Sequence, residues 1–193
     1  MGTNRLEAFS DGVIAILITI MVLELRIPQN PDFAALRPLV PVFLTYVLSF
    51  INLGIYWNNH HHMLQATERV NGRILWANLF LLFWLSLFPF FTGWMGENHF
   101  ATVPTAAYGV VLLLAGLSYF ILSTAIVAEH GPDSAISTAL GRDTKAKMSL
   151  AIYAVAIPLA FLNRWVALGL YVVVAMMWLV PDRRLEPRVP RSV

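Results

Sequence analysis

The sequence predicts an all-α integral membrane protein with six transmembrane helices. Hydrophobic residues make up 58% of its 193 residues, and the mean hydropathy is +0.67. Charged residues account for 12%, against roughly 25% in typical soluble domains. The chain also divides into apolar runs bounded by proline, glycine or charged residues, which is the pattern of membrane helices joined by short loops.

The first apolar run carries acidic residues at both ends. Asp11 and Glu24 leave only Gly12 to Leu23 free of charge, about 18 Å of helix against a hydrocarbon core of roughly 30 Å. It does not resemble a removable signal peptide, because Ser10 and Asp11 interrupt its start and no small-residue cleavage site precedes Glu24. A short span of this kind is tolerable when protein surrounds it, so we expect the first helix to be innermost.

Five further apolar runs complete the six spans. The second is expected to continue to Leu64, and a tight turn at Asn163 and Arg164 separates the last two. In chain order the runs are Pro38 to Asn59, Ile74 to Gly96, Val103 to Ala128, Met148 to Asn163 and Trp165 to Pro181.

The basic residues predict the orientation in the membrane. Six spans place both termini on one side, and only Arg26, Arg37 and Arg164 fall on the opposite side. By the positive-inside rule the termini are cytoplasmic. The sequence therefore predicts one six-helix domain over residues 1–181 and a basic cytoplasmic tail over residues 182–193. The terminal side would carry Arg5, Arg69, Arg73, Arg142, Lys145, Lys147, Arg183, Arg184, Arg188 and Arg191.

An apolar stripe runs along the first helix. With about 100° between successive residues, six side chains fall within about 60° of Ile16. Ser10 and Asp11 point about 120° to 140° away, toward other helices of the same chain. This periodicity fits both a packing surface in the bundle and the lining of a pore. The six residues are Phe9, Gly12, Thr19, Ile20, Leu23 and Ile27.

A polar cluster is predicted at one end of the first two helices. The stretch YWNNHHHML places Trp57 and three histidines at the depth of Arg5, Ser10 and Asp11, because the two helices are antiparallel. Successive helical residues point about 100° apart, so three consecutive histidines cannot converge on one ion, and no metal site is predicted. We expect one histidine and Trp57 to hydrogen-bond the Asp11 carboxylate, while Arg5 balances its charge.

Several function classes find no support in the sequence. The absence of cysteine excludes a thiolate metal site or a cysteine nucleophile. HExxH, GxSxG and glycine-rich phosphate-loop motifs are absent, and no acid, base and nucleophile set suggests an enzyme acting on lipid. The basic residues follow the topology instead of forming a nucleic-acid surface. We therefore predict that the chain is not an enzyme and has no cofactor.

The first two helices resemble a known family. Arg5, the stretch FSDGVIAILITIMVLEL from Phe9 to Leu25, and YWNNHH from Tyr56 to His61 are similar to prokaryotic members of the transmembrane protein 175 family, relatives of the lysosomal potassium channel. The resemblance implies a potassium-permeable cation channel in the cell membrane, built as a homotetramer with the first helix of each subunit lining the pore. It implies permeant potassium ions and no carbonyl filter, and no TVGYG-like loop is present.

The resemblance also implies residue roles. Ile16 matches the pore-constricting aliphatic residue, Ile20 and Leu23 continue the constriction, and Thr19 matches a hydroxyl layer beside it. A polar network that holds the first two helices together is implied at five positions, where the spacing from Trp57 favours His60 over His61 or His62. These positions are Arg5, Ser10, Asp11, Trp57 and His60.

A proton-coupled membrane transporter remains the alternative. Asp11 and His60 would act as relay groups, since a carboxylate and an imidazole can exchange protons near neutral pH. The sequence lacks an inverted repeat, and no proline or glycine interrupts the middle of the first helix. Both features are common in such transporters, so the channel is the favoured interpretation.

Overall fold

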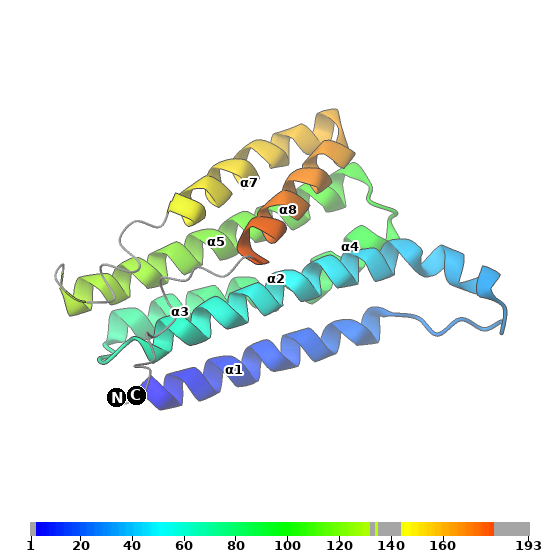
Figure 1. The fold of residues 1–193 in the computed structure, drawn as a ribbon. Helices are drawn as coiled ribbons and strands as arrows, with labels where there is room; N and C mark the ends of the chain where they lie inside the picture. The colour runs from blue at the N-terminus through cyan, green and yellow to red at the C-terminus, as the bar shows by residue number, and fades with distance from the viewer. Residues whose placement is uncertain (1–2, 132–133, 135–143, 180–193) are drawn as a thin grey trace, which may run out of the picture.

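The computed structural model describes residues 3–131, 134 and 144–179, and these residues form a bundle of helices without strands (Figure 1). Two short 3₁₀ segments, η1 and η2, flank the loop between the first two spans. The elements are α1 (Thr3–Ile20), η1 (Met21–Glu24), η2 (Phe33–Leu39), α2 (Val40–Gln65), α3 (Gly72–Ser86), α4 (Phe88–Glu97), α5 (Thr102–His130), α7 (Thr144–Leu162) and α8 (Arg164–Leu179).

The helices confirm the all-α fold with six spans. Five continuous segments of the described chain are long and apolar enough to cross a membrane, and α8 is a shorter apolar helix of 16 residues, about 24 Å long. The predicted boundaries agree to within a few residues. The tail predicted at 182–193 lies outside the described residues, and the cytoplasmic position of the termini stays a prediction.

The third span differs from the prediction of one continuous helix. It divides at Leu87 into α3 and α4. Pro89 is the cause, because it has no N–H to donate to the carbonyl of Leu85 and its ring crowds that carbonyl. Asn71 caps the start of α3, where its Oδ1 accepts a 3.0 Å hydrogen bond from the backbone N–H of Ile74.

Helix α5 lies at the centre of the bundle. It packs against α3 on one side and α7 on the other, while α2 packs against α1 and α4 (Figure 1). The close approach of α5 and α8 depends on Gly109, because a Cβ at this position would lie 2.0 Å from Oη of Tyr171. Small residues therefore let these helices approach each other.

Helix α1 lies at the edge of the bundle and not at its centre (Figure 1). In the most apolar 18-residue stretch of the first span, only 22% is buried within the chain, compared with 44% in the corresponding stretch of α5. One chain alone therefore leaves α1 partly uncovered. The first helix can be innermost only if several copies of the chain assemble around it.

Candidate functional site

One face of α1 is buried against the neighbouring helices. Its residues recur every three or four positions, as expected for one side of a helix. This face packs on α2, α3 and α4 and fixes the rotation of α1 about its own axis. The buried residues are Leu6, Ser10, Ile14, Leu17 and, at the start of η1, Met21.

The opposite face of α1 is uncovered and almost wholly apolar. Ile16 is 60% exposed and Leu23 is 76% exposed, with Phe9 and Ile20 about half exposed. A Cβ added at Gly12 would meet no atom within 4 Å. This face contains the predicted stripe, and such a continuous apolar surface marks a contact with lipid or with another protein surface.

Thr19 is the polar exception on the uncovered face. Its Oγ1 lies 3.0 Å from the carbonyl oxygens of both Ala15 and Ile16, so the hydroxyl proton points back at the helix backbone. The side chain is exposed, and the oxygen lone pairs face away from α1. Thr19 therefore presents a hydrogen-bond acceptor, the kind of atom that binds a cation.

A buried hydrogen-bonded chain connects α1, α2 and α3. The Nε2–H of His60 donates to Oδ1 of Asn78 at 2.7 Å, because a carbonyl oxygen can only accept. Nδ2 of Asn78 donates to Oγ of Ser10 at 2.9 Å, and Ser10 donates to the carbonyl of Leu6 at 2.8 Å. The structure thus joins Ser10 and His60 through an asparagine that the sequence analysis did not identify.

His61 forms a second contact between α1 and α2. Its Nδ1 lies 2.9 Å from Oε1 of Glu7, within ion-pair distance, although no hydrogen bond joins the two atoms. The Trp57 ring stacks on His61, with centroids 5.8 Å apart and planes 19° apart. Trp57 therefore stacks on His61 and forms no hydrogen bond with Asp11 in the described part of the chain. The adjacent His60 and His61 have different partners because their rings point in different directions.

Asp11 and Arg5 are not joined by the contacts that the sequence analysis expected. Oδ1 of Asp11 is buried without a hydrogen-bond partner among the described residues. Arg5 is exposed, and within the same residues it forms no hydrogen bond or ion pair. Asn78 accepts the hydrogen bond from His60 that was expected to go to Asp11. The Asp11 carboxylate instead lies beside Glu7 and His61. One carboxylate oxygen from each acidic residue and one ring nitrogen of His61 lie within 4.8 Å of one another.

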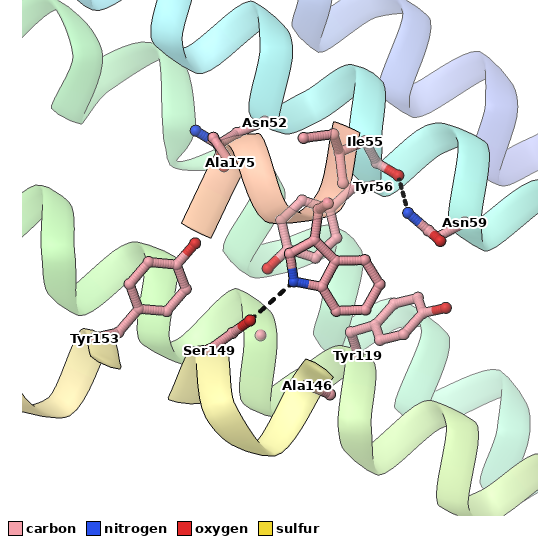
Figure 2. Close-up of a pocket in the computed structure, with 11 residues that line it drawn as sticks. Asn52, Ile55, Tyr56, Asn59, Tyr119, Ala146, Ser149, Tyr153 and Ala175 are labelled. Carbon is pink, nitrogen blue, oxygen red and sulfur yellow. Dashed lines mark hydrogen bonds between the residues drawn. The ribbon is translucent and has the colours of Figure 1, made fainter. Parts of the chain in front are cut away.

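A separate cavity, lined by apolar and uncharged polar residues, lies between α2, α5, α7 and α8, away from α1 (Figure 2). Its volume is about 40 Å³, enough for a few water molecules. At its edge, Nε1 of Trp178 donates a 2.8 Å hydrogen bond to Oγ of Ser149, and Nδ2 of Asn59 donates to the carbonyl of Ile55. None of the described residues that line it is charged, and the cavity does not reach the uncovered face of α1.

The opposite end of α1 is tied to α4. Arg26, just beyond η1, donates from Nη2 to Oε1 of Glu97 at 2.6 Å. A Cβ on Gly93 would lie 2.9 Å from Oε2 of Glu24, so the Glu24 side chain rests against α4. The two acidic residues that bound the first apolar run therefore have different surroundings: Asp11 lies near Glu7 and His61, and Glu24 lies against Gly93.

These features define a multi-pass α-helical membrane protein in which the first helix presents an apolar face that its own chain does not cover. Residues 5–89 match the family model described as the endosomal/lysosomal potassium channel TMEM175. The chain is 50% identical over 186 residues to a potassium channel of Chryseobacterium sp. (strain P1-3), covering 96% of this chain and 97% of the relative. The chain belongs to the TMEM175 family.

The structural comparison covers nearly the whole chain. The crystal structure of a lysosomal potassium-selective channel TMEM175 homolog from Chamaesiphon minutus superposes with a TM-score of 0.80 at 29% identity, over 96% of this chain and 98% of that one. A human relative, described as the endosomal/lysosomal proton channel TMEM175, is 36% identical over an 84-residue alignment that covers 35% of this chain and 17% of that protein. The relatives are ion channels, which confirms the prediction that the chain is not an enzyme.

Proposed function

We propose that this protein is a potassium-permeable cation channel of the cell membrane, with cytoplasmic termini, and that four copies assemble with α1 at the centre. The observation that carries the proposal is the uncovered apolar face of α1, which includes Ile16, Ile20 and Leu23. The potassium-channel descriptions of the bacterial relatives support the choice of ion.

The geometry of four helices suits a narrow pore. Neighbouring helices about 10 Å apart at the corners of a square have axes about 7 Å from the centre. A branched aliphatic side chain such as Ile16 reaches across most of that distance. A ring of four would nearly close the path and would gate it by excluding water until the helices move apart.

The ion would pass this ring with little replacement for its water. Potassium holds its hydration shell less tightly than sodium, so an apolar constriction favours it modestly. Thr19 supplies the nearest compensation, because its oxygen lone pairs point away from the helix on the same face. We therefore assign Ile16, Ile20 and Leu23 to the constriction and Thr19 to a ring of acceptor oxygens beside it.

The polar contacts behind α1 hold it against the other helices of its subunit. Ser10 of α1 and His60 of α2 are both hydrogen-bonded to Asn78 of α3, and Trp57 stacks on His61. Arg5 and Asp11 lie at the same end of the helix. A rigid attachment of this kind lets each subunit carry its α1 as one body when the pore opens or closes.

The alternative is a proton-coupled transporter that uses Asp11 and His60 as relay groups. The hydrogen-bonded chain from His60 runs through Asn78 and Ser10 to a backbone carbonyl and not to Asp11. Substitution Asp11→Asn separates the two functions, because it would abolish proton-coupled transport and leave the potassium flux of a channel in place.

The decisive experiment is potassium flux from liposomes that contain the purified protein, with sodium as the competing cation. We expect Ile16→Asn to increase the flux and reduce the preference for potassium. Val155→Asn is the matched control, because Val155 on α7 has a similar exposure of 55% but lies outside the proposed pore. Unchanged flux in intact Ile16→Asn tetramers, or flux that saturates and follows a pH gradient, would overturn the channel proposal.

A further inference from the structure

A long apolar groove lies between the beginnings of α2 and α8. His99 and Phe100, in the turn that joins α4 to α5, also line it. Its volume is about 850 Å³. Along α2 it extends from Val40 to Ile51, about 16 Å of helix. Leu168 and Val172 of α8 form the facing wall. No residue of α1 lines the groove, so it is separate from the uncovered face of α1 and from the proposed pore residues.

The only charged side chain among the described lining residues is Arg164, at the end of the groove where α8 begins. Its guanidinium lies 5.4 Å from the centre of the Trp165 ring, and no described carboxylate forms an ion pair with it. Trp165 is more than half exposed. Tryptophan beside arginine at a helix end is typical of the level of the lipid headgroups.

The α4–α5 turn shapes the same end of the groove. His99 and Phe100 both have left-handed backbone conformations, with φ of 49° and 57°, which non-glycine residues rarely adopt. A 3.0 Å hydrogen bond from the Phe100 N–H to the carbonyl of Met95 closes the turn. The turn places the Phe100 ring 5.7 Å from that of Trp165, so aromatic rings flank the cationic end.

We propose that this groove binds an anionic phospholipid, with its headgroup phosphate on Arg164 and an acyl chain along α2. The groove matches a molecule that is negative at one end and hydrocarbon over the rest, because the described lining residues with a polar side-chain group are Arg164, Trp165 and His99, and the others are apolar. A peptide segment would place backbone polar groups against these walls without partners. The proposal does not depend on ion conduction.

The test measures lipid retained by the purified protein in nanodiscs that contain equal amounts of phosphatidylglycerol and phosphatidylcholine, by native mass spectrometry. We expect the wild type to favour phosphatidylglycerol by about fivefold, the effect of one basic residue at the headgroup level. Arg164→Gln removes this preference but leaves an acyl chain bound. Arg37→Gln keeps the wild-type preference, because it changes an exposed arginine of η2 that is predicted on the same side of the membrane but does not line the groove.

A second variant tests the acyl-chain part of the groove. Gly169 lines the groove, and a Cβ there meets no atom within 4 Å, so Gly169→Leu adds an apolar side chain that narrows the groove from α8. We expect it to abolish retention of both lipids. Val166→Leu is the matched control, because Val166 is an exposed residue of α8 that does not line the groove. If Gly169→Leu does not fold, Val172→Trp fills the groove from an exposed lining position.

Two results would overturn the proposal. The first is wild-type lipid selectivity and retention in both Arg164→Gln and the groove-filling variant. The second is occupation of the groove by another copy of the chain. Since the natural sequence has no cysteine, Val172→Cys gives a single thiol, and a disulfide-linked dimer of this variant formed in membranes would show such an interface.

Discussion

Asn78 donates a 2.9 Å hydrogen bond from its Nδ2 to Oγ of Ser10, across the contact between α3 and α1. The same amide accepts a hydrogen bond from His60 through its oxygen. All three side chains are fully or almost fully buried. The Asn78 amide therefore hydrogen-bonds residues of two other helices at once. Its nitrogen donates to Ser10 of α1 and its oxygen accepts from His60 of α2, so the two groups are not interchangeable.

Replacing Asn78 by alanine should destabilise the subunit by about 1–3 kcal/mol, because it leaves the buried Nε2–H of His60 without an acceptor. Thermal unfolding in detergent measures the loss. Asn98→Ala is the control, since Asn98 is exposed and hydrogen-bonds only within its own turn. Equal unfolding temperatures for the two variants would contradict the role assigned to Asn78.

Replacing Thr19 by valine should lower potassium flux by about fivefold, since it removes an oxygen acceptor worth about 1 kcal/mol while keeping the side-chain shape. Thr19→Ser retains the oxygen and should retain most of the flux. Reversal potentials under mixed potassium and sodium solutions would show whether selectivity changes with it. Identical behaviour of the valine variant and the wild type would exclude Thr19 from the ion path.

Replacing Gly109 by alanine should destabilise the contact between α5 and α8 by about 1–3 kcal/mol, because the new methyl group overlaps the buried Tyr171 hydroxyl. Gly54→Ala is the matched control, since a Cβ at that position meets no atom within 4 Å. This control should stabilise α2 by up to about 1 kcal/mol through helix propensity. Thermal unfolding of both variants tests the difference, and equal shifts would show that α5 and α8 are not in close contact.

Replacing Glu97 by glutamine should have a small effect, below about 1 kcal/mol, although its 2.6 Å contact with Arg26 is short. Both side chains are largely solvent-exposed, so water screens the attraction. Any measured loss should shrink further in 1 M salt. A large, salt-independent loss of stability would mean that the pair is buried in the assembled protein.

The spans and the two faces of α1 could be predicted because hydropathy and helical periodicity are properties of neighbouring residues. The helical wheel placed Ile16 and Leu23 on one side and Ser10 on another, and the structure has the same arrangement. The break at Leu87 was also predictable, since Pro89 stands inside the apolar run.

The partners of the polar residues could not be predicted because they depend on how the helices are rotated and packed. Asn78 is an amide within an apolar run, and nothing in the neighbouring sequence indicates that α3 contacts α1 at the level of Ser10. The division of roles between His60 and His61 depends on which direction each ring takes around α2. The contact of Glu7 with His61 has the same origin.

If four copies assemble as proposed, the uncovered face of α1 also determines what drives their association. Its Phe9, Ile16, Ile20 and Leu23 side chains are solvated as well by acyl chains as by another helix, so the hydrophobic effect gives no driving force for association inside a bilayer. Close packing must supply it. The balance between single chains and assemblies is then a two-dimensional mass-action equilibrium, and diluting the protein with lipid should shift it toward single chains.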